Sequence, residues 1–256
     1  MNKRLALAGL LGLLIVGPPA ATAAPRVAPI SAHCSLATAT AVMKALPQLF
    51  NDPPTTQVLC GSFTGPHSNA MVASVSTPGC GFSIGWIVFR RDGDAWVKVF
   101  ESQRGAFLDK LGTRFRETWS LLRNGDPHCL PTGGTKSRIW HWNGTRLARG
   151  AFVRTGAMFF SPSRNVSCTI AIGSVRCASK TPPHAARLTT RGAVTTCTGA
   201  HCLTVPTAFP NAAVLRYGHS VAAGPFRCTS RQNGVTCVVT RTGKGFRINK
   251  AGVTRV

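Results

Sequence analysis

Ten cysteines behind an N-terminus typical of bacterial export constrain this chain more than any other feature. Lys3 and Arg4 precede an apolar run over Leu5–Val16, and the small residues Ala21-Thr22-Ala23 follow a Gly-Pro-Pro break. The run of 12 residues is too short for a bilayer core of about 30 Å at about 1.5 Å per residue. We therefore expect a signal peptide over residues 1–23, secretion of a chain that begins at Ala24, and no transmembrane segment in that chain. A retained membrane anchor is the alternative.

An even number of cysteines in an exported chain predicts disulfides. The alternative is a metal site built from Cys197-x-x-x-His201-Cys202 or from His128-Cys129, but neither contains the CxxC pairs of a structural zinc site. We therefore expect neither a metal nor a cofactor. The cysteines expected in disulfides are Cys34, Cys60, Cys80, Cys129, Cys168, Cys177, Cys197, Cys202, Cys228 and Cys237.

The charge of the chain is strongly positive and unevenly distributed. Its formal net charge is +23, and from Pro127 to Val256 there is no Asp or Glu against 18 Lys and Arg. This half therefore lacks a carboxylate for acid–base catalysis, for a catalytic triad or for a calcium or magnesium cage. Its field attracts polyanions. A compositional bias is the alternative, since 22 of the 30 basic residues are Arg.

The pattern of elements predicts two domains after a flexible segment over residues 24–33. Residues 34–154 should form an α+β domain, with one helix on an antiparallel sheet. Ser35 is a candidate N-cap of a helix over Leu36–Leu46, and Asp92-Gly93 is a candidate hairpin turn. Strands are expected over Gln57–Ser62, Met71–Val75, Gly81–Arg90, Ala95–Phe100, Thr113–Leu121, Ser137–Trp142 and Arg146–Phe152.

Glu117 interrupts an otherwise regular strand pattern. Apolar and polar residues alternate over Thr113–Leu121, and Glu117 falls on the same parity as Phe115 and Trp119. A site residue is one explanation of a carboxylate at such a position. A rim position or a salt bridge to a neighbouring arginine is the other, and it is the one we favour.

Residues 155–256 should form an all-β, small, disulfide-stapled module, with a domain junction between about Phe152 and Phe159. Two Cys-x8-Cys units recur at an offset of 60 residues, Cys168 to Cys177 and Cys228 to Cys237. A two- or four-residue hairpin loop at the centre of each unit places its two cysteines opposite each other, within disulfide reach. Bridges between the two hairpins are the alternative. Cys197 and Cys202 are close enough in sequence to close a local loop.

Two stretches of the N-terminal half carry a family resemblance: Asn124-Gly125-Asp126-Pro127-His128-Cys129-Leu130-Pro131-Thr132-Gly133-Gly134 and Trp140-His141-Trp142-Asn143-Gly144-Thr145-Arg146-Leu147. In these stretches the half resembles secreted and lipid-anchored actinobacterial proteins of the LppP/LprE lipoprotein type. Leu130 stands where that family has a second cysteine, and the chain has no lipobox. The resemblance implies no known active site.

Five stretches of the C-terminal half carry a second resemblance: Phe160-Ser161-Pro162-Ser163-Arg164-Asn165-Val166-Ser167-Cys168, Val175-Arg176-Cys177, Val214-Leu215-Arg216-Tyr217-Gly218-His219, Gly234-Val235-Thr236-Cys237 and Gly243-Lys244-Gly245-Phe246-Arg247-Ile248-Asn249-Lys250. In these stretches the half resembles a domain of unknown function that is common in exported actinobacterial proteins. Arg164 stands where that family usually has Gly. Lys244 stands where the family often has His, and this argues against a histidine-based activity at that position.

No sequence motif for catalysis, dinucleotide binding, phosphate binding or specific nucleic-acid binding is present. Two functions stay open. The favoured one is a non-enzymatic binding module of the cell envelope or the extracellular space, with a basic surface for an anionic polymer or lipid head groups. The alternative is an extracytoplasmic, hydrolase-like enzyme whose site lies in the N-terminal domain, beside the acids. For the binding function, the candidate polyanion-binding residues are Arg241, Lys244, Arg247 and Lys250.

Overall fold

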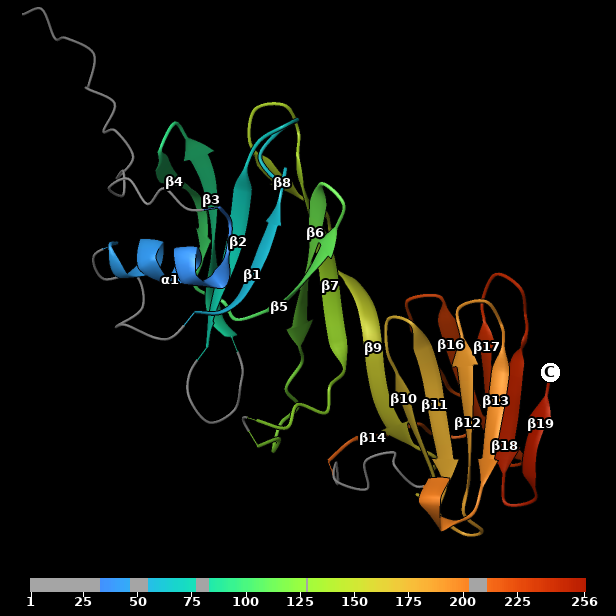
Figure 1. Ribbon diagram of the computed structural model, residues 1–256. Helices are drawn as coiled ribbons and strands as arrows, with labels where there is room; N and C mark the ends of the chain where they lie inside the picture. Colours follow the sequence, from blue (N-terminus) through green and yellow to red (C-terminus); the bar gives the residue numbers. More distant parts are fainter. Residues whose placement is uncertain (1–32, 47–54, 77–82, 128, 203–210) are drawn as a thin grey trace, which may run out of the picture.

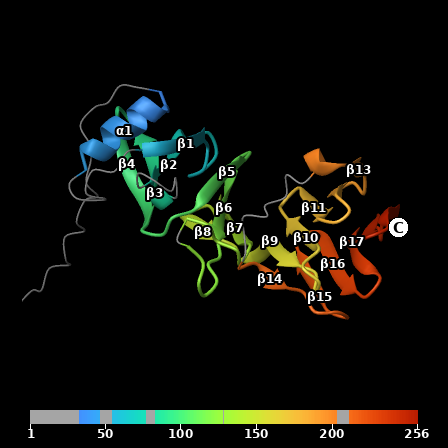
Figure 2. The same ribbon diagram turned by 90° about the horizontal axis from the view of Figure 1, so that it is seen from below.

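The computed structural model describes residues 33–46, 55–76, 83–127, 129–202 and 211–256. The predicted signal peptide, residues 24–32 and Cys80 lie outside these ranges. Antiparallel sheets dominate the described residues, and the molecule is elongated, with its two halves joined at strand β9 (Figure 1 and Figure 2). No helix in the described ranges is long and apolar enough to cross a membrane. The antiparallel sheets, the one α-helix of the described residues and the C-terminal disulfides confirm the predicted fold class, which is α+β in the N-terminal half and all-β, disulfide-stapled in the C-terminal half.

The N-terminal half begins with helix α1 (Leu36–Lys44), at the predicted place. Ser35 is its N-cap, because its hydroxyl accepts a hydrogen bond from the backbone N–H of Thr38 at 3.1 Å. The helix packs on a sheet of four strands, in the order β1-β2-β3-β4. These strands are β1 (Thr55–Gly61), β2 (Ala70–Ser76), β3 (Ser83–Asp92) and β4 (Ala95–Ser102).

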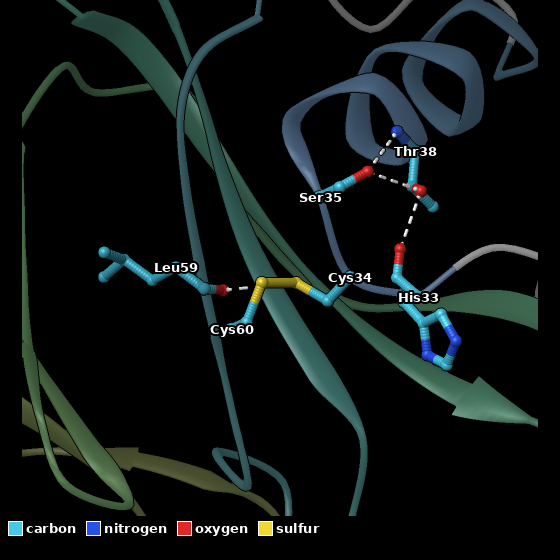
Figure 3. Close-up of a disulfide and its surroundings, with 6 residues drawn as sticks. All are labelled: His33, Cys34, Ser35, Thr38, Leu59 and Cys60. Carbon is cyan, nitrogen blue, oxygen red and sulfur yellow. Dashed lines mark hydrogen bonds between the residues drawn. A yellow bond between two sulfur atoms is a disulfide. The ribbon is translucent and has the colours of Figure 1, made fainter.

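The disulfide Cys34–Cys60 joins the residue before the helix cap to strand β1 (Figure 3). The hydroxyl of Thr38 also donates to the backbone oxygen of His33 at 2.7 Å. These contacts hold the start of the helix against the sheet. One predicted detail was wrong by a residue: the β3–β4 turn is Gly93-Asp94, because Asp92 pairs with Ala95 and Gly93 takes the left-handed φ of +59° that glycine tolerates.

The β1–β4 sheet is buried on both faces, and this makes the N-terminal half a three-layer structure. Ala73, Ile87 and Phe89 face α1, whereas Val72 and Trp86 face a second sheet. Helix α1 therefore covers the face that points away from the second sheet (Figure 1). The second sheet begins with β5 (Phe107–Leu111), β6 (Arg114–Ser120), β7 (Thr135–Trp142) and the short β8 (Leu147–Arg149).

Strand β9 (Val153–Phe160) connects the two halves through one continuous sheet. Its first residues pair with β7, and its last four pair with β10. The predicted domain junction at residues 154 and 155 therefore lies inside a strand, in the part of β9 that pairs with β7. Independent folding of the two halves stays a prediction.

The C-terminal half is two sheets packed face to face around one core. β10–β13 continue the long sheet, and β15–β19 form the other. The elements are β10 (Val166–Ile170), β11 (Ser174–Ser179), β12 (His184–Thr189), β13 (Val194–Thr198), the 3-10 helix η1 (Ala200–Cys202), β14 (Ala213–Val214), β15 (Ser220–Ala223), β16 (Phe226–Arg231), β17 (Gly234–Val239), β18 (Gly245–Asn249) and β19 (Gly252–Arg255).

The internal repeat is two facing hairpins, each with a cross-strand disulfide. Cys168 pairs with Cys177 on β10–β11, and Cys228 pairs with Cys237 on β16–β17, with 4.1 Å between the Cα atoms of each pair. The two bridges meet in the core, where the Sγ atoms of Cys177 and Cys237 are 3.7 Å apart. Both bridges have the predicted pairing within the hairpins, and the local bridge Cys197–Cys202 is also formed.

Candidate functional site

Glu117 is fully buried on β6, at the inner face of the second sheet. Its Oε2 accepts hydrogen bonds from Nε of Arg138 and, at 2.7 Å, from the indole N–H of Trp140. Its Oε1 accepts one from the indole N–H of Trp119 at 2.7 Å. The predicted salt bridge to a neighbouring arginine is present. Glu117 therefore fixes the positions of three large side chains, Trp119, Arg138 and Trp140, each of which donates a hydrogen bond to its carboxylate.

The cross-strand register explains why these side chains meet. Phe115 lies opposite Trp140, Glu117 opposite Arg138, and Trp119 opposite Lys136. Residues two apart on a strand share a face, so three successive pairs run along the inner face of β6 and β7. The first pair is buried in the core between the two sheets, and the third is only partly buried. The Glu117–Arg138 pair therefore stands at the border between an apolar core and an open cavity.

The open cavity has a volume of about 600 Å³, within the range of small-molecule sites. We name it the cationic cavity. It lies where the end of β4 and the loop after it approach β6, β7 and β8. It is lined by Phe100, Glu101, Ser102, Gln103, Arg104, Trp119, Lys136, Arg138, Arg149 and Phe152.

Aromatic rings hold several of the cations of this cavity in place. The guanidinium of Arg138 lies 4.3 Å from the ring centre of Phe152, and the ammonium of Lys136 lies 4.8 Å from the rings of both Trp119 and Phe152. The guanidinium of Arg104 lies 5.1 Å from the Trp119 ring. Stacking of this kind orders long side chains while leaving their N–H groups available to a ligand.

The balance of charge leaves the cavity positive. Glu117 forms an ion pair with Arg138. Glu101 is the one carboxylate in the lining, and it forms an ion pair with Lys98 at 2.9 Å. Among the residues that the structure describes, no carboxylate lies within ion-pair distance of Arg104, Lys136 or Arg149. These three cations can therefore bind an anion without first breaking an ion pair.

The four residues proposed from sequence for polyanion binding do not gather in one place. Arg241 and Lys244 are exposed in the β17–β18 turn, and Lys250 is exposed in the β18–β19 turn at the other end of β18. Arg247 lies between them on β18, half-buried, opposite Thr236 and Thr254. Five residues of strand span about 17 Å, so the four form no single cluster. Lys250 lines a cavity that is described below.

The cationic cavity was not predicted from the sequence. On one strand Lys136 and Arg138 share a face because they are two residues apart, and on another strand Glu117 and Trp119 share a face for the same reason. This parity was visible in the sequence, but the register that sets one strand against the other was not. Arg104 and Arg149 come from a loop and a short strand, and no local pattern connects them with β6 and β7.

The described cysteines do not form a metal site. The candidate ligands Cys197, His201 and Cys202 do come within 4.8 Å of one another, but Cys197 and Cys202 are joined in a disulfide and cannot act as thiolates. The same holds for Cys168, Cys177 and Cys237, which are also oxidised. His128 lies outside the described residues.

No known family, curated protein or solved structure matches this chain.

Proposed function

We propose that this protein is a non-enzymatic binding module of the cell envelope or extracellular space, and that it holds anionic groups in the cationic cavity. One observation carries the proposal: Arg104, Lys136 and Arg149 line a single cavity in which the two nearby carboxylates are already paired, Glu101 with Lys98 and Glu117 with Arg138. The ligand class is an anionic cell-envelope polymer or a lipid head group. Phosphate suits the site, because guanidinium groups bind its oxygens through paired N–H donors.

The placement of the acids supports binding over hydrolysis. Asp92 and Asp94 lie at the β3–β4 turn, Asp109 lies on β5, and Asp126 lies in the loop before β7. A glycosidase, for example, needs its two carboxylates about 5–10 Å apart on either side of one substrate. Glu101 lines the cationic cavity in its pair with Lys98, whereas Glu117 is fully buried and bonded to Arg138 and Trp140, so the lining offers one carboxylate and not two.

The proposed location, outside the cytoplasm, rests on the predicted signal peptide over residues 1–23. Disulfides are frequent in oxidising compartments, and those of this chain suit export through the predicted signal peptide. We expect mass spectrometry of the exported protein to find a chain that begins at Ala24. An intact N-terminus retained in the membrane would contradict this part of the proposal. The relationship to the two actinobacterial groups named above is also proposed on sequence alone.

Binding of a poly(glycerol phosphate) oligomer to the mature chain tests the function. Trp119 lies in the cavity, so its fluorescence should report binding. Replacing both Arg104 and Arg149 with Gln should weaken binding by about tenfold or more, because two charge-assisted contacts are lost. The affinity should also fall as salt rises from low to physiological concentration, because exposed charges are screened within about 8 Å.

A matched control separates a site from general attraction by net charge. Arg90 and Arg114 are exposed cations in the same half of the molecule, outside the lining of the cavity. Replacing both with Gln removes the same charge and should change the affinity by no more than about twofold. Equal losses from the two double variants would refute the cavity as the site. Turnover of the oligomer would refute the non-enzymatic reading.

A further inference from the structure

A second cavity, of about 500 Å³, lies at one end of the C-terminal half. Four separate parts of the chain form it: the β9–β10 turn, the segment before β15, the β16–β17 turn and the β18–β19 turn. We name it the turn cavity. It is lined by Ser161, Ser163, Asn165, Val166, Tyr217, Arg231, Gln232, Asn233, Gly234, Asn249, Lys250 and Ala251.

Hydrogen bonds to the backbone hold the turns of this cavity in fixed positions. The side chain of Asn249 donates to the backbone oxygen of Asn233 at 2.9 Å and accepts from the N–H of Ala251 at 2.9 Å, so it joins two turns. His184 anchors the same residue, with 2.7 Å between its Nε2 and the backbone oxygen of Asn249.

The opposite wall is held in the same way. The hydroxyl of Ser161 accepts from the N–H of Val166 at 3.1 Å. The amide of Asn165 donates to the backbone oxygen of Thr181 at 3.1 Å and accepts from the N–H of Thr181 at 3.0 Å. A site whose walls are ordered before binding loses little conformational entropy when a ligand enters.

Five other side chains of the lining are exposed and available to contact a ligand. Arg231 and Lys250 are exposed cations, and neither takes part in an ion pair among the residues that the structure describes. The side chains of Gln232 and Asn233 are exposed amides, each with donors and an acceptor. Tyr217 is 45% exposed, and its ring is therefore available as a flat apolar surface.

We propose that the turn cavity binds an acidic saccharide, which is a sugar chain that carries carboxylate or sulfate groups. The two cations match the anionic groups, and the amides and hydroxyls match the sugar hydroxyls, which both donate and accept. The tyrosine ring matches the apolar C–H face of a pyranose. A simple phosphate site would need the cations alone. The proposal is independent of the cationic cavity, since the two linings share no residue.

Calorimetric titration of the mature chain with three probes tests the proposal. The probes are an oligogalacturonate, the same oligomer with every carboxylate methyl-esterified, and a linear polyphosphate of equal charge. We expect the oligogalacturonate to bind, and to bind at least about tenfold more tightly than either other probe, because it alone offers both charge and sugar hydroxyls. Equal binding of the polyphosphate would overturn the saccharide assignment, and absence of oligogalacturonate binding would overturn the site.

Variants locate the site and keep it distinct from the cationic cavity. Replacing both Arg231 and Lys250 with Gln should weaken oligogalacturonate binding by about tenfold, and Tyr217→Ala should also weaken it. Replacing Arg241 and Lys244 with Gln removes the same charge from the other end of β18 and should change binding by no more than about twofold. Equal losses from both double variants would overturn the proposal. Loss only in the Arg104 and Arg149 double variant would assign the saccharide to the cationic cavity and equally overturn it.

Discussion

Removing the charge of Glu117 should destabilise the whole N-terminal half. In Glu117→Gln, the three donors that surround the carboxylate meet one amide oxygen and one amide N–H₂ group, so at least one donor faces another donor. Arg138, whose side chain is 9% exposed, loses its counter-charge at the same time. Breaking one partner of a buried pair typically costs about 3–5 kcal/mol. We expect about 3 kcal/mol, because the guanidinium can turn toward the open cavity.

Urea unfolding under oxidising conditions, followed by tryptophan fluorescence and circular dichroism, measures this loss in the free energy of unfolding. Asp94→Asn is the control, since Asp94 is 88% exposed in its pair with Arg91 and an exposed pair contributes at most about 1 kcal/mol. The double variant with Leu at both 117 and 138 should recover part of the loss, because it leaves no unpaired buried charge.

Two results would refute this reasoning. The first is a loss below about 1 kcal/mol in Glu117→Gln, which is the range of an exposed pair. The second is a double-variant cycle at positions 117 and 138 that is additive within about 0.5 kcal/mol, because residues in one buried network should couple more strongly than that.

Three further predictions follow from other parts of the structure. Burial raises the pKa of Asp126, but hydrogen bonds from the N–H groups of Arg123 and Thr132 and from the Thr132 hydroxyl outweigh this effect, so the pKa lies below the usual 3.8. The stability that Asp126 contributes should therefore be complete above pH 3.8 and should be lost as the pH falls through the lower pKa of the folded state. Acid titration of Asp126→Asn should lack this loss of stability. Non-reducing peptide mapping should recover Cys168 linked to Cys177 and Cys228 linked to Cys237, and replacing the first pair with Ala should cost about 2–3 kcal/mol in urea unfolding; a Cys177–Cys237 link would contradict the assignment. A fragment over residues 150–256, which keeps all of β9, should fold alone and give a dispersed amide NMR spectrum, and a collapsed spectrum would show that the halves depend on each other.

Local patterns were sufficient for most of the elements. Ser35 followed by apolar residues at helical spacing predicts α1, because capping and one buried face both act within a few residues. The two Cys-x8-Cys units predict cross-strand bridges, because the geometry of a short hairpin sets which residues face each other. The turn error at Asp92-Gly93 shows the limit of such patterns, since a shift of one residue depends on the register of the complete β3–β4 pair.

The sequence alone placed Glu117 on the apolar parity of its strand, and it left open a site residue, a rim position or a salt bridge to a neighbouring arginine. It determined that the C-terminal half carries no carboxylate chemistry, because it contains no acid. Only the tertiary structure decided that Arg138 is the partner of Glu117. It also decided that Arg104, Lys136 and Arg149 meet around one cavity, whereas Arg241 and Lys250 lie at opposite ends of β18. The physical reason is that a site on a β-sheet is assembled by strand register and by loops far apart in sequence. Register is set by the packing of whole faces, and no short stretch of the chain contains that information.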